Sequence, residues 1–239
     1  MAQRAAEVYF RADPERAALL PILAQSNSTG AGWTDYHLLH RYIVVRRPSR
    51  ILEFGSGRTT VVMAHALAAT HLKFPKHPPG HLCSMEDVLR FHEDAKAIMP
   101  PQLSRYVTLI HSPKREATWR NEIWGFGYSE LPSGPFNFVF VDGPTEYRDE
   151  EAIARGIKGA CLDLLYLLER EPEVLLDVVV DQKFSSLEAY ESVLPRGTIR
   201  YDPVMDVGVM DGVSGGMLGE HRTIDRVKRG DAWQILKLK

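Results

Sequence analysis

Short runs of apolar residues alternate with longer segments of helical periodicity along most of the chain. The runs have the length of buried strands, and the segments between them place apolar residues three or four positions apart, as amphipathic helices do. Strands alternating with helices predict an α/β fold with a doubly wound, mostly parallel, seven-stranded sheet and helices on both faces. The predicted strands cover residues 51–54, 81–85, 106–110, 136–141, 174–180, 198–201 and 233–238, and the main helices cover 61–69, 88–98, 150–169 and 185–194.

The segment before the first strand has a different composition. Residues 14–24 predict a short amphipathic helix, and the polar, glycine-containing residues 25–32 predict a loop. A second helix is expected to begin at a Thr34 cap and to run through Ile43. We therefore expect an N-terminal helical extension at residues 1–32 and a main domain at residues 33–239.

The sequence allows two interpretations for each of two other segments. Trp119, Trp124, Phe126 and Tyr128 lie in a glycine-punctuated stretch, which is either a surface loop folded on its own aromatic rings or one wall of a substrate or adenine pocket. Residues 204–230 contain Gly208, Gly212, Gly215, Gly216 and Gly219 and lie between two predicted strands. We predict a mobile substrate lid there, with an irregular hairpin extension as the alternative.

Polar residues stand where the predicted strands end. Each of the first five strands is closed by one of Glu53, Glu86, His111, Asp142 and Asp181. Ligands of parallel α/β sheets bind at the carboxyl ends of the strands. Buried strands need none of these side chains for packing, so the pattern predicts a working site at this edge.

The first strand leads into a glycine turn. Glu53-Phe54-Gly55-Ser56-Gly57 is followed by Thr59 and Thr60, which open the next helix. Glycines allow a tight turn and a close backbone approach, and the helix start offers N–H groups and a partial positive charge. We expect a ligand with an anionic end to bind there.

Two classes of ligand use such a turn. Dinucleotide sites require a third small residue, glycine or alanine, where this chain has Thr60. The acid two positions before the first glycine, Glu53, is instead typical of the first motif of class I S-adenosylmethionine-dependent methyltransferases, which residues 53–57 resemble. The resemblance extends to residues 84–87 and 138–143, and it implies a sheet whose last strand is antiparallel to the others.

The resemblance also implies roles for individual residues. Glu53 would help to hold the amino group of the methionine moiety, and the turn and helix start would face its carboxylate. Glu86, as the acid at the tip of the second strand, is expected to accept hydrogen bonds from ribose hydroxyls. The predicted cofactor-binding residues are Glu53, Gly55, Ser56, Gly57, Thr59, Thr60, Glu86, Asp87, His111, Ser112 and Asp142.

The end of the fourth strand is similar to that of metal-dependent O-methyltransferases. Those enzymes carry an acid after the fourth strand and an Asp-Asn or acidic pair after the fifth, where this chain has Asp142 and then Asp181-Gln182. The resemblance implies Mg²⁺ as a candidate second cofactor, held by Asp142, Asp181 and Gln182, that would orient an acceptor hydroxyl and lower its pKa. Those enzymes place a Lys or His base three residues after the acid that follows the fourth strand, where this chain has Thr145. Lys183 or His221 is the candidate substitute for this base. Asp142 and Lys183 are the predicted catalytic residues.

The predicted function is S-adenosylmethionine-dependent methyl transfer to an oxygen of a small molecule. One alternative is an NAD(P)-dependent oxidoreductase, which uses the same glycine turn and strand-tip acid, although Thr60 and Glu53 argue against it. Another is a non-catalytic binding protein that retains the methyltransferase fold. The sequence does not identify the methyl acceptor, and it leaves a homodimer open.

The composition limits the kinds of partner and the cellular compartment that we expect for this protein. The formal net charge is −2 with scattered basic residues, so no nucleic-acid partner is expected, and residues 46–50 are read as a solvated basic loop. No apolar run approaches a membrane span, and the first ten residues do not resemble a secretory signal. Cys83 and Cys161 lack metal or redox spacing and are expected to be buried thiols. We therefore expect a cytoplasmic protein without a membrane partner.

Overall fold

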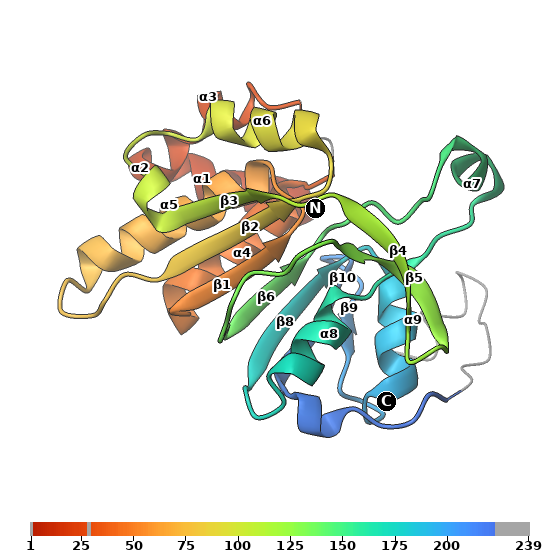
Figure 1. Cartoon of the computed structure of the whole chain (residues 1–239). Helices are drawn as coiled ribbons and strands as arrows, with labels where there is room; N and C mark the ends of the chain where they lie inside the picture. The colour runs from red at the N-terminus through yellow and green to blue at the C-terminus, as the bar shows by residue number, and fades with distance from the viewer. Residues whose placement is uncertain (1, 28–29, 223–239) are drawn as a thin grey trace. The chain divides into compact units, whose positions relative to one another are not determined.

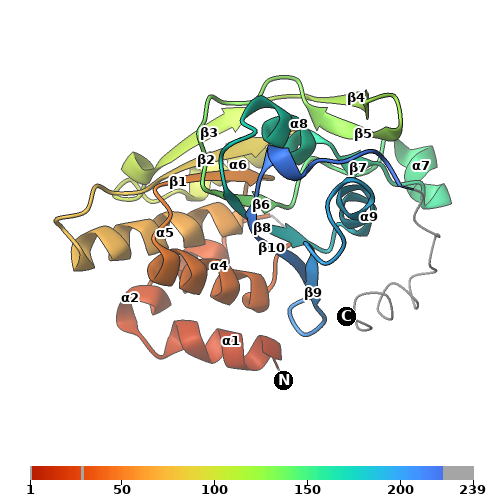
Figure 2. The same cartoon turned by 90° about the horizontal axis from the view of Figure 1, so that it is seen from below.

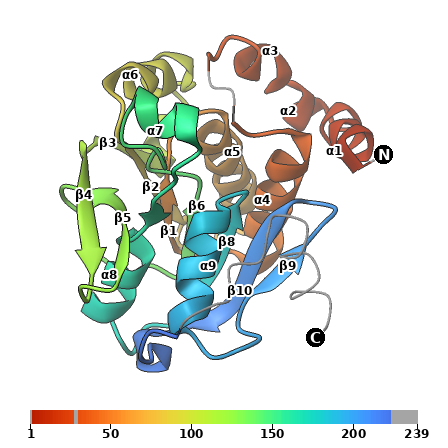
Figure 3. The same ribbon diagram turned by 90° about the vertical axis from the view of Figure 1, so that its right-hand side faces the viewer.

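The structure is a computed structural model that describes residues 2–27 and 30–222. The chain divides into two compact units, Met1–Pro113 and Lys114–Lys239. Figures 1 to 3 show the chain from three directions. The predicted boundary at residue 32 stays a prediction.

The first unit is a three-stranded parallel sheet with helices packed beside it. Strand β1 (Arg50–Phe54) pairs with β2 (His81–Glu86), which pairs with β3 (Val107–His111). Because Phe54 lies opposite Met85 and Glu86 lies opposite His111, the ends of the three strands are level with one another. The first three predicted strands are thus confirmed.

The helices of this unit are α1 (Ala2–Arg11), α2 (Pro14–Ala17), α3 (Leu20–Leu23), α4 (Trp33–Arg46), α5 (Arg58–Lys73) and α6 (Leu89–Ile98), with a 3-10 turn, η1 (Ser104–Tyr106). Helix α1 lies against α4, which packs against α5 (Figure 2). Phe10 of α1 is fully buried in a cluster with Tyr36 of α4 and Val61 of α5. The N-terminal helices therefore contribute to the core of the first unit.

Two predictions for the N-terminal segment were wrong, and one of its helices was not predicted. Helix α1 was missed, and residues 14–24 form two four-residue helices rather than one, because Asp13 caps α2 and Pro21 begins a new turn. Thr34 is not a cap but lies inside α4, where its hydroxyl accepts a hydrogen bond from Gln3 Nε2 at 2.8 Å. The cap interaction comes from Asp35, whose carboxylate accepts the Gly32 N–H at 2.6 Å.

The second unit contains the remaining strands of the main sheet. Strand β6 (Phe138–Val141) pairs in parallel with β8 (Leu176–Asp181), while β10 (Val207–Val213) runs antiparallel to β8 and pairs with β9 (Arg200–Asp202). The strand order of the seven-stranded sheet is β3-β2-β1-β6-β8-β10-β9. The predicted α/β fold with a mostly parallel seven-stranded sheet is confirmed, and the antiparallel strand is the last in the described sequence.

The antiparallel strand comes from the segment predicted to be a lid. Within residues 204–222 the chain forms β10 and a 3-10 turn, η2 (Gly215–Met217), so the lid prediction was wrong for this part. Gly208 packs against helix α9 (Phe184–Val193), which lies beside β10 in Figure 3: a Cβ there would lie 2.3 Å from Leu187 Cδ2, so any other residue would make the Leu187 side chain shift. The rest of the predicted lid, and the strand predicted at 233–238, lie outside the described residues.

A second, smaller sheet replaces the predicted aromatic loop. Strands β4 (Lys114–Trp119) and β5 (Ile123–Tyr128) form an antiparallel hairpin, and β5 pairs in parallel with β7 (Ala160–Cys161). Only Trp119 of β4 is buried, and the charged residues at the start of this strand give it no apolar run in the sequence. The loop reading of this stretch was therefore wrong, because its aromatic residues belong to a paired hairpin.

The long helix predicted at 150–169 is interrupted. Helix α7 (Glu150–Arg155) ends at Gly156 in a left-handed conformation, β7 follows, and helix α8 (Asp163–Arg170) begins afterwards. A Cβ at Gly125 of β5 would lie 2.1 Å from the Ala160 carbonyl oxygen, so β7 packs directly on the backbone of β5. The apolar periodicity of this segment is shared between a strand and two helices, and it was wrongly read as one helix.

Two predictions about composition can be compared with the structure. Cys83 and Cys161 are both free and buried, as expected. Among the described residues, no helix is long and apolar enough to cross a membrane.

Candidate functional site

The glycine turn after β1 has the backbone that its sequence predicts. Gly55 has a φ of +96°, in the region that residues with a Cβ seldom adopt, and its N–H donates to the Met85 carbonyl at 2.8 Å. The Gly57 N–H donates to Thr60 Oγ1 at 2.9 Å. The turn is thus tied both to the neighbouring strand and to the first residues of α5.

Glu53 is hydrogen-bonded to the first residues of the helix that follows this turn. Its side chain is fully buried, and its two carboxylate oxygens accept hydrogen bonds from Thr59 Oγ1 at 2.5 Å and from Thr60 Oγ1 at 2.6 Å. Since the Thr60 proton is directed at Glu53, Ser84 Oγ at 3.2 Å acts as the donor to Thr60. Thr60 occupies the position where the dinucleotide pattern requires a small residue. Its hydroxyl is hydrogen-bonded to Glu53, the acid that is typical of the methyltransferase pattern.

Glu86 lies at the end of β2, next to the turn. One carboxylate oxygen accepts the Ser56 N–H at 3.0 Å, and the other accepts the Val88 N–H at 2.9 Å. The residue is only 5% exposed. Burial, helped by the charge of Asp87, raises the pKa of Glu86 to about 7, although the hydrogen bonds from Val88 and Ser56 favour the charged form.

The end of β3 completes this group of strand tips. The Ser112 N–H donates to the Glu86 carbonyl at 3.0 Å, and Ser112 itself is buried. His111 is exposed, with its ring centroid 5.7 Å from that of the buried His92 on α6. Asp87 is half-buried beside Glu86. The structure therefore brings together the residues of the first three strand tips that the sequence predicted.

One element of this region was missed by sequence reasoning. Asp94 of α6 accepts a hydrogen bond from Ser26 Oγ at 2.7 Å and one from Asn27 Nδ2 at 3.1 Å. Arg58, the first residue of α5, donates to the Ser26 carbonyl at 2.7 Å. The loop before α4 is thus fastened to the residues that follow the glycine turn. No local signal could have indicated this, because the partners are separated by 32 and 68 positions.

The predicted residues of the second unit form a separate group. Lys183 Nζ lies 3.8 Å from Asp142 Oδ1, and both side chains are mostly shielded from solvent. Asp181 is buried, whereas Gln182 is exposed and adopts a left-handed φ of +42°. The predicted catalytic pair, Asp142 and Lys183, is therefore in contact.

This group does not fit a magnesium site well. The Lys183 ammonium group beside Asp142 competes with a divalent cation for the same carboxylate, and Gln182 is exposed to solvent. No cluster of three or more His, Cys, Asp or Glu side chains suited to a metal occurs within residues 2–27 and 30–222. The assignment of Asp142, Asp181 and Gln182 to Mg²⁺ stays a prediction.

Two further polar side chains near Asp142 were not predicted. Lys114 of β4 donates to Thr145 Oγ1 at 2.9 Å and to the Tyr147 carbonyl at 2.5 Å, so a lysine does reach the position three residues after Asp142. Glu146 is buried between Lys158 Nζ at 2.8 Å and Ser185 Oγ at 2.6 Å. A lysine at the start of an unrecognised hairpin carries no sequence signal for this contact.

Comparisons with known proteins give structural matches only. No protein-family profile matches the chain, and no curated protein matches it. The chain is similar to cofactor-bound Rv0187 from MTB, with 20% identity, a TM-score of 0.42, and coverage of 71% of this chain and 65% of that chain, which is just under two thirds.

Two other solved structures to which the chain is similar are methyltransferases. One is the O-methyltransferase TomG from Streptomyces achromogenes, involved in tomaymycin synthesis and in complex with SAM, with 20% identity, a TM-score of 0.40, and coverage of 76% of this chain and 74% of that chain. The other is a methyltransferase from Geobacter sulfurreducens, with 13% identity, a TM-score of 0.48, and coverage of 84% and 90%. At identities this low, the similarity extends to the arrangement of strands and helices and not to the chemistry.

Proposed function

We propose that this chain binds S-adenosylmethionine and transfers its methyl group to an oxygen of a small molecule. The observation that carries the proposal is the buried carboxylate of Glu86, held at 3.0 Å from the Ser56 N–H of the glycine turn. Its oxygen Oε1 accepts only the Val88 N–H among the hydrogen bonds of the described residues, and a carboxylate oxygen can accept a second bond. A ribose hydroxyl is the donor that such an acceptor beside a nucleoside-binding turn would take.

Two further features support a methyltransferase over a dinucleotide-dependent enzyme. Thr60 is fully buried and bonded to Glu53, so the third small residue of a dinucleotide turn is absent for a structural reason. Strand β10 lies antiparallel between β8 and β9, and an antiparallel strand at this end is what the resemblance of residues 53–57 implies.

Asp142 and Lys183 are the proposed reactive pair of the second unit. When bound, S-adenosylmethionine supplies a methyl group on a sulfonium, and transfer breaks its carbon–sulfur bond as a carbon–oxygen bond forms. The acceptor hydroxyl loses its proton in this step, and the Asp142 carboxylate is the proposed proton acceptor. Lys183, 3.8 Å away, would hold that carboxylate in place and stabilise negative charge on the acceptor oxygen. Because the ammonium competes with a divalent cation, no step is assigned to Mg²⁺.

The first test measures cofactor binding. Replacing Glu86 with glutamine should weaken the binding of S-adenosylhomocysteine by about 10- to 100-fold, because it removes a charged acceptor of ribose hydroxyl groups. The wild-type affinity should also depend on pH. Glu86, with a pKa of about 7, is mostly protonated at pH 6 and mostly ionised at pH 8, so affinity should rise about tenfold over this interval. Isothermal titration calorimetry at several pH values checks both effects.

The matched control is His111→Gln, which removes a neighbouring titratable group and leaves Glu86 in place. The affinity of this variant should keep the pH dependence, whereas that of Glu86→Gln should be flat. Tight binding of NADH together with no binding of S-adenosylhomocysteine would overturn the proposal in favour of an oxidoreductase. Binding of neither ligand would favour a non-catalytic protein.

The second test distinguishes catalysis by Asp142 and Lys183 from catalysis assisted by Mg²⁺. We expect methyl transfer to a panel of phenols and alcohols to persist in the presence of EDTA, and Asp142→Asn to reduce kcat by about 10²- to 10⁴-fold, the range of a lost general base. S-adenosylhomocysteine affinity measured in parallel shows whether Asp142 also binds the cofactor, as the sequence predicted. Loss of activity with EDTA and recovery with Mg²⁺ would instead support the assignment to Asp142, Asp181 and Gln182.

A further inference from the structure

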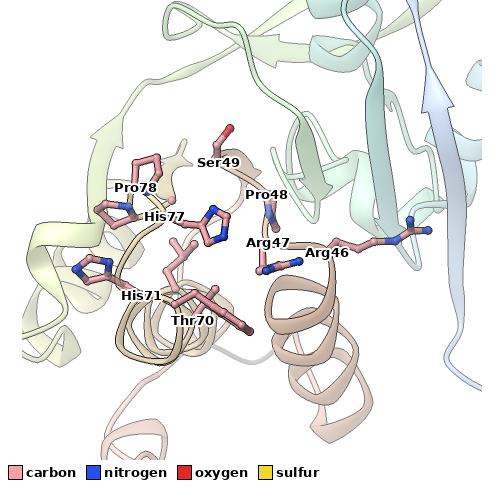
Figure 4. Close-up of a pocket in the computed structure, with 12 residues that line it drawn as sticks. Arg46, Arg47, Pro48, Ser49, Thr70, His71, His77 and Pro78 are labelled. Atoms are coloured by element: carbon pink, nitrogen blue, oxygen red, sulfur yellow. The ribbon is translucent and has the colours of Figure 1, made fainter.

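A cavity of about 320 Å³ lies at the end of the first unit where β1 and β2 begin (Figure 4). It is lined by residues 46–49, by the last turns of α5 and by residues of the loop that precedes β2. The glycine turn follows the other end of β1, and Glu86 is the last residue of β2; these strands are five and six residues long. At a rise of about 3.3 Å per residue, the cavity is roughly 16 Å from the proposed cofactor site.

The segments around this cavity carry only positive formal charge. Residues 46–50 and 71–81 contain three arginines, two lysines and three histidines but no aspartate or glutamate, in a chain whose net charge is −2. Helices α4 and α5 both end here, and each helix end carries a partial charge of about −0.5. Two helix ends offset about one of the five arginine and lysine charges, so an excess of positive charge remains for a ligand.

Arg47 is held at this cavity by an unusual backbone. It follows the last residue of α4 with φ +54° and ψ +53°, a left-handed conformation that glycine usually supplies and that costs other residues about 1–2 kcal/mol. Its guanidinium carbon lies 4.7 Å from the centroid of the Phe74 ring, which fixes the side chain over the loop. The left-handed conformation ends α4, with the Arg47 N–H donating to the Ile43 carbonyl at 2.9 Å, and it fixes the Arg47 backbone beside the cavity.

Three of the polar residues that line the cavity already have hydrogen-bond or electrostatic partners. Thr70 donates its hydroxyl proton to the Ala66 carbonyl at 2.7 Å, and Arg46 and Ser49 have partners of their own. In Figure 4 the side chain of Arg46 extends away from the group, whereas Arg47 and His77 lie among the other lining residues. Arg47 and His77, together with His71, whose buried Nδ1 has no hydrogen-bond partner among the described residues, are therefore the polar side chains left for a ligand.

The remaining walls are apolar and closely packed. Leu67 and Phe74 line the cavity together with prolines of both loops. A Cβ at Gly80 would lie 2.5 Å from the Pro48 carbonyl oxygen and 2.7 Å from Leu67 Cδ2, so the two loops meet at a point where no side chain fits. The volume falls in the range of small-molecule sites.

We propose that this cavity binds a small molecule that carries a phosphate group beside an apolar or aromatic group. Arg47 and His77 bind the phosphate oxygens, since a guanidinium offers several N–H donors in a geometry that matches an oxyanion. Leu67 and Phe74 contact the apolar part. The site is separate from the cofactor site, so its occupancy does not depend on methyl transfer.

Calorimetric titration of the full chain with phenyl phosphate and with inorganic phosphate tests this proposal. Phenyl phosphate should bind saturably and several-fold more tightly than inorganic phosphate, because only the former fills the apolar part. Arg47→Met keeps an unbranched apolar stem over Phe74 and removes the charge, and it should weaken phenyl phosphate binding about tenfold. Lys76→Met removes one positive charge from the neighbouring loop before β2, at a residue that does not line the cavity, and it should change the affinity less than twofold.

Several outcomes would overturn the proposal. Absence of saturable binding of either probe in the millimolar range is one. Equal losses in Arg47→Met and Lys76→Met would show a diffuse basic surface, and tighter binding of a short RNA or DNA oligonucleotide, weakened equally by both changes, would identify it as a nucleic-acid surface. Circular dichroism and S-adenosylhomocysteine binding of both variants show whether the first unit remains folded.

Discussion

Replacing Glu53 with alanine is expected to lower the free energy of unfolding by about 3–5 kcal/mol, which would leave many proteins of this size only marginally folded. The carboxylate is fully buried and accepts the hydroxyl groups of Thr59 and Thr60, which are themselves buried. Removing it leaves two buried donors without an acceptor, at about 1–3 kcal/mol each, and opens a cavity. Urea unfolding monitored by tryptophan fluorescence measures the loss.

Two variants help to interpret this result. Glu53→Gln keeps the shape and one acceptor oxygen and should be less destabilising than alanine. Glu7→Ala removes an acid from the surface of α1, where its partner Arg11 is exposed, and should change stability by less than 1 kcal/mol. If Glu53→Ala folds with nearly unchanged stability but loses affinity for S-adenosylhomocysteine, the acid acts on the ligand as the sequence predicted, and the structural role is wrong.

Acidification is expected to destabilise the first unit through His40. This side chain is buried between α1 and α5, with Tyr9 Oη 3.0 Å from Nδ1 and His65 Nδ1 3.2 Å from Nε2. Burial, together with the charges of His65 and Arg16, lowers the pKa of His40 to about 3. The contact network therefore requires a neutral imidazole at ordinary pH.

The sign of the effect follows from the two states. In the unfolded chain His40 takes up a proton near pH 6.5, whereas in the folded chain it does so only near pH 3. The unfolded state binds more protons between these values, so stability is fully present above pH 6.5 and falls as the pH is lowered toward 3. Because the unfolded-state histidine is only half protonated at pH 6.5, about 2.3 kcal/mol of this contribution is lost between pH 6.5 and pH 4.5.

A comparison with a variant isolates this contribution. His40→Gln should be less stable than the wild type at pH 7, because two buried contacts change, but its stability should fall less between pH 6.5 and pH 4.5. His77→Gln, on an exposed loop, should follow the wild-type curve. Glu86 and Asp163, whose pKa values are both raised to about 7, change stability in the opposite direction and do so in all three proteins. Parallel pH profiles of the wild type and His40→Gln would contradict the role of His40.

The strand–turn–helix around Glu53 could be predicted in detail because its signals are local. An apolar run ends at Phe54, glycines at 55 and 57 permit the turn, and α5 begins directly afterwards. Short apolar runs and a period of 3.6 residues are each properties of one segment, so the alternating order of strands and helices could also be predicted. The positions of Glu86 and Ser112 at neighbouring strand ends followed from that order alone.

Pairing between distant segments decided the remaining structure. Residues 207–213 resemble a glycine-containing loop in isolation, and they form a strand because β8 and β9 offer edges to pair with. Residues 160–161 continue a helical pattern in the sequence. They form a strand instead, because Gly125 has no side chain and lets them pair closely with β5.

The chemistry divides in the same way. The sequence by itself determined which acids stand at the strand tips, because that depends only on where each apolar run ends. Only the tertiary structure decided what each acid touches: threonines for Glu53, the turn amide of Ser56 for Glu86, and an ammonium group for Asp142. Hydrogen bonds and ion pairs act over about 3–4 Å, and whether two side chains approach that closely depends on packing that no local pattern encodes.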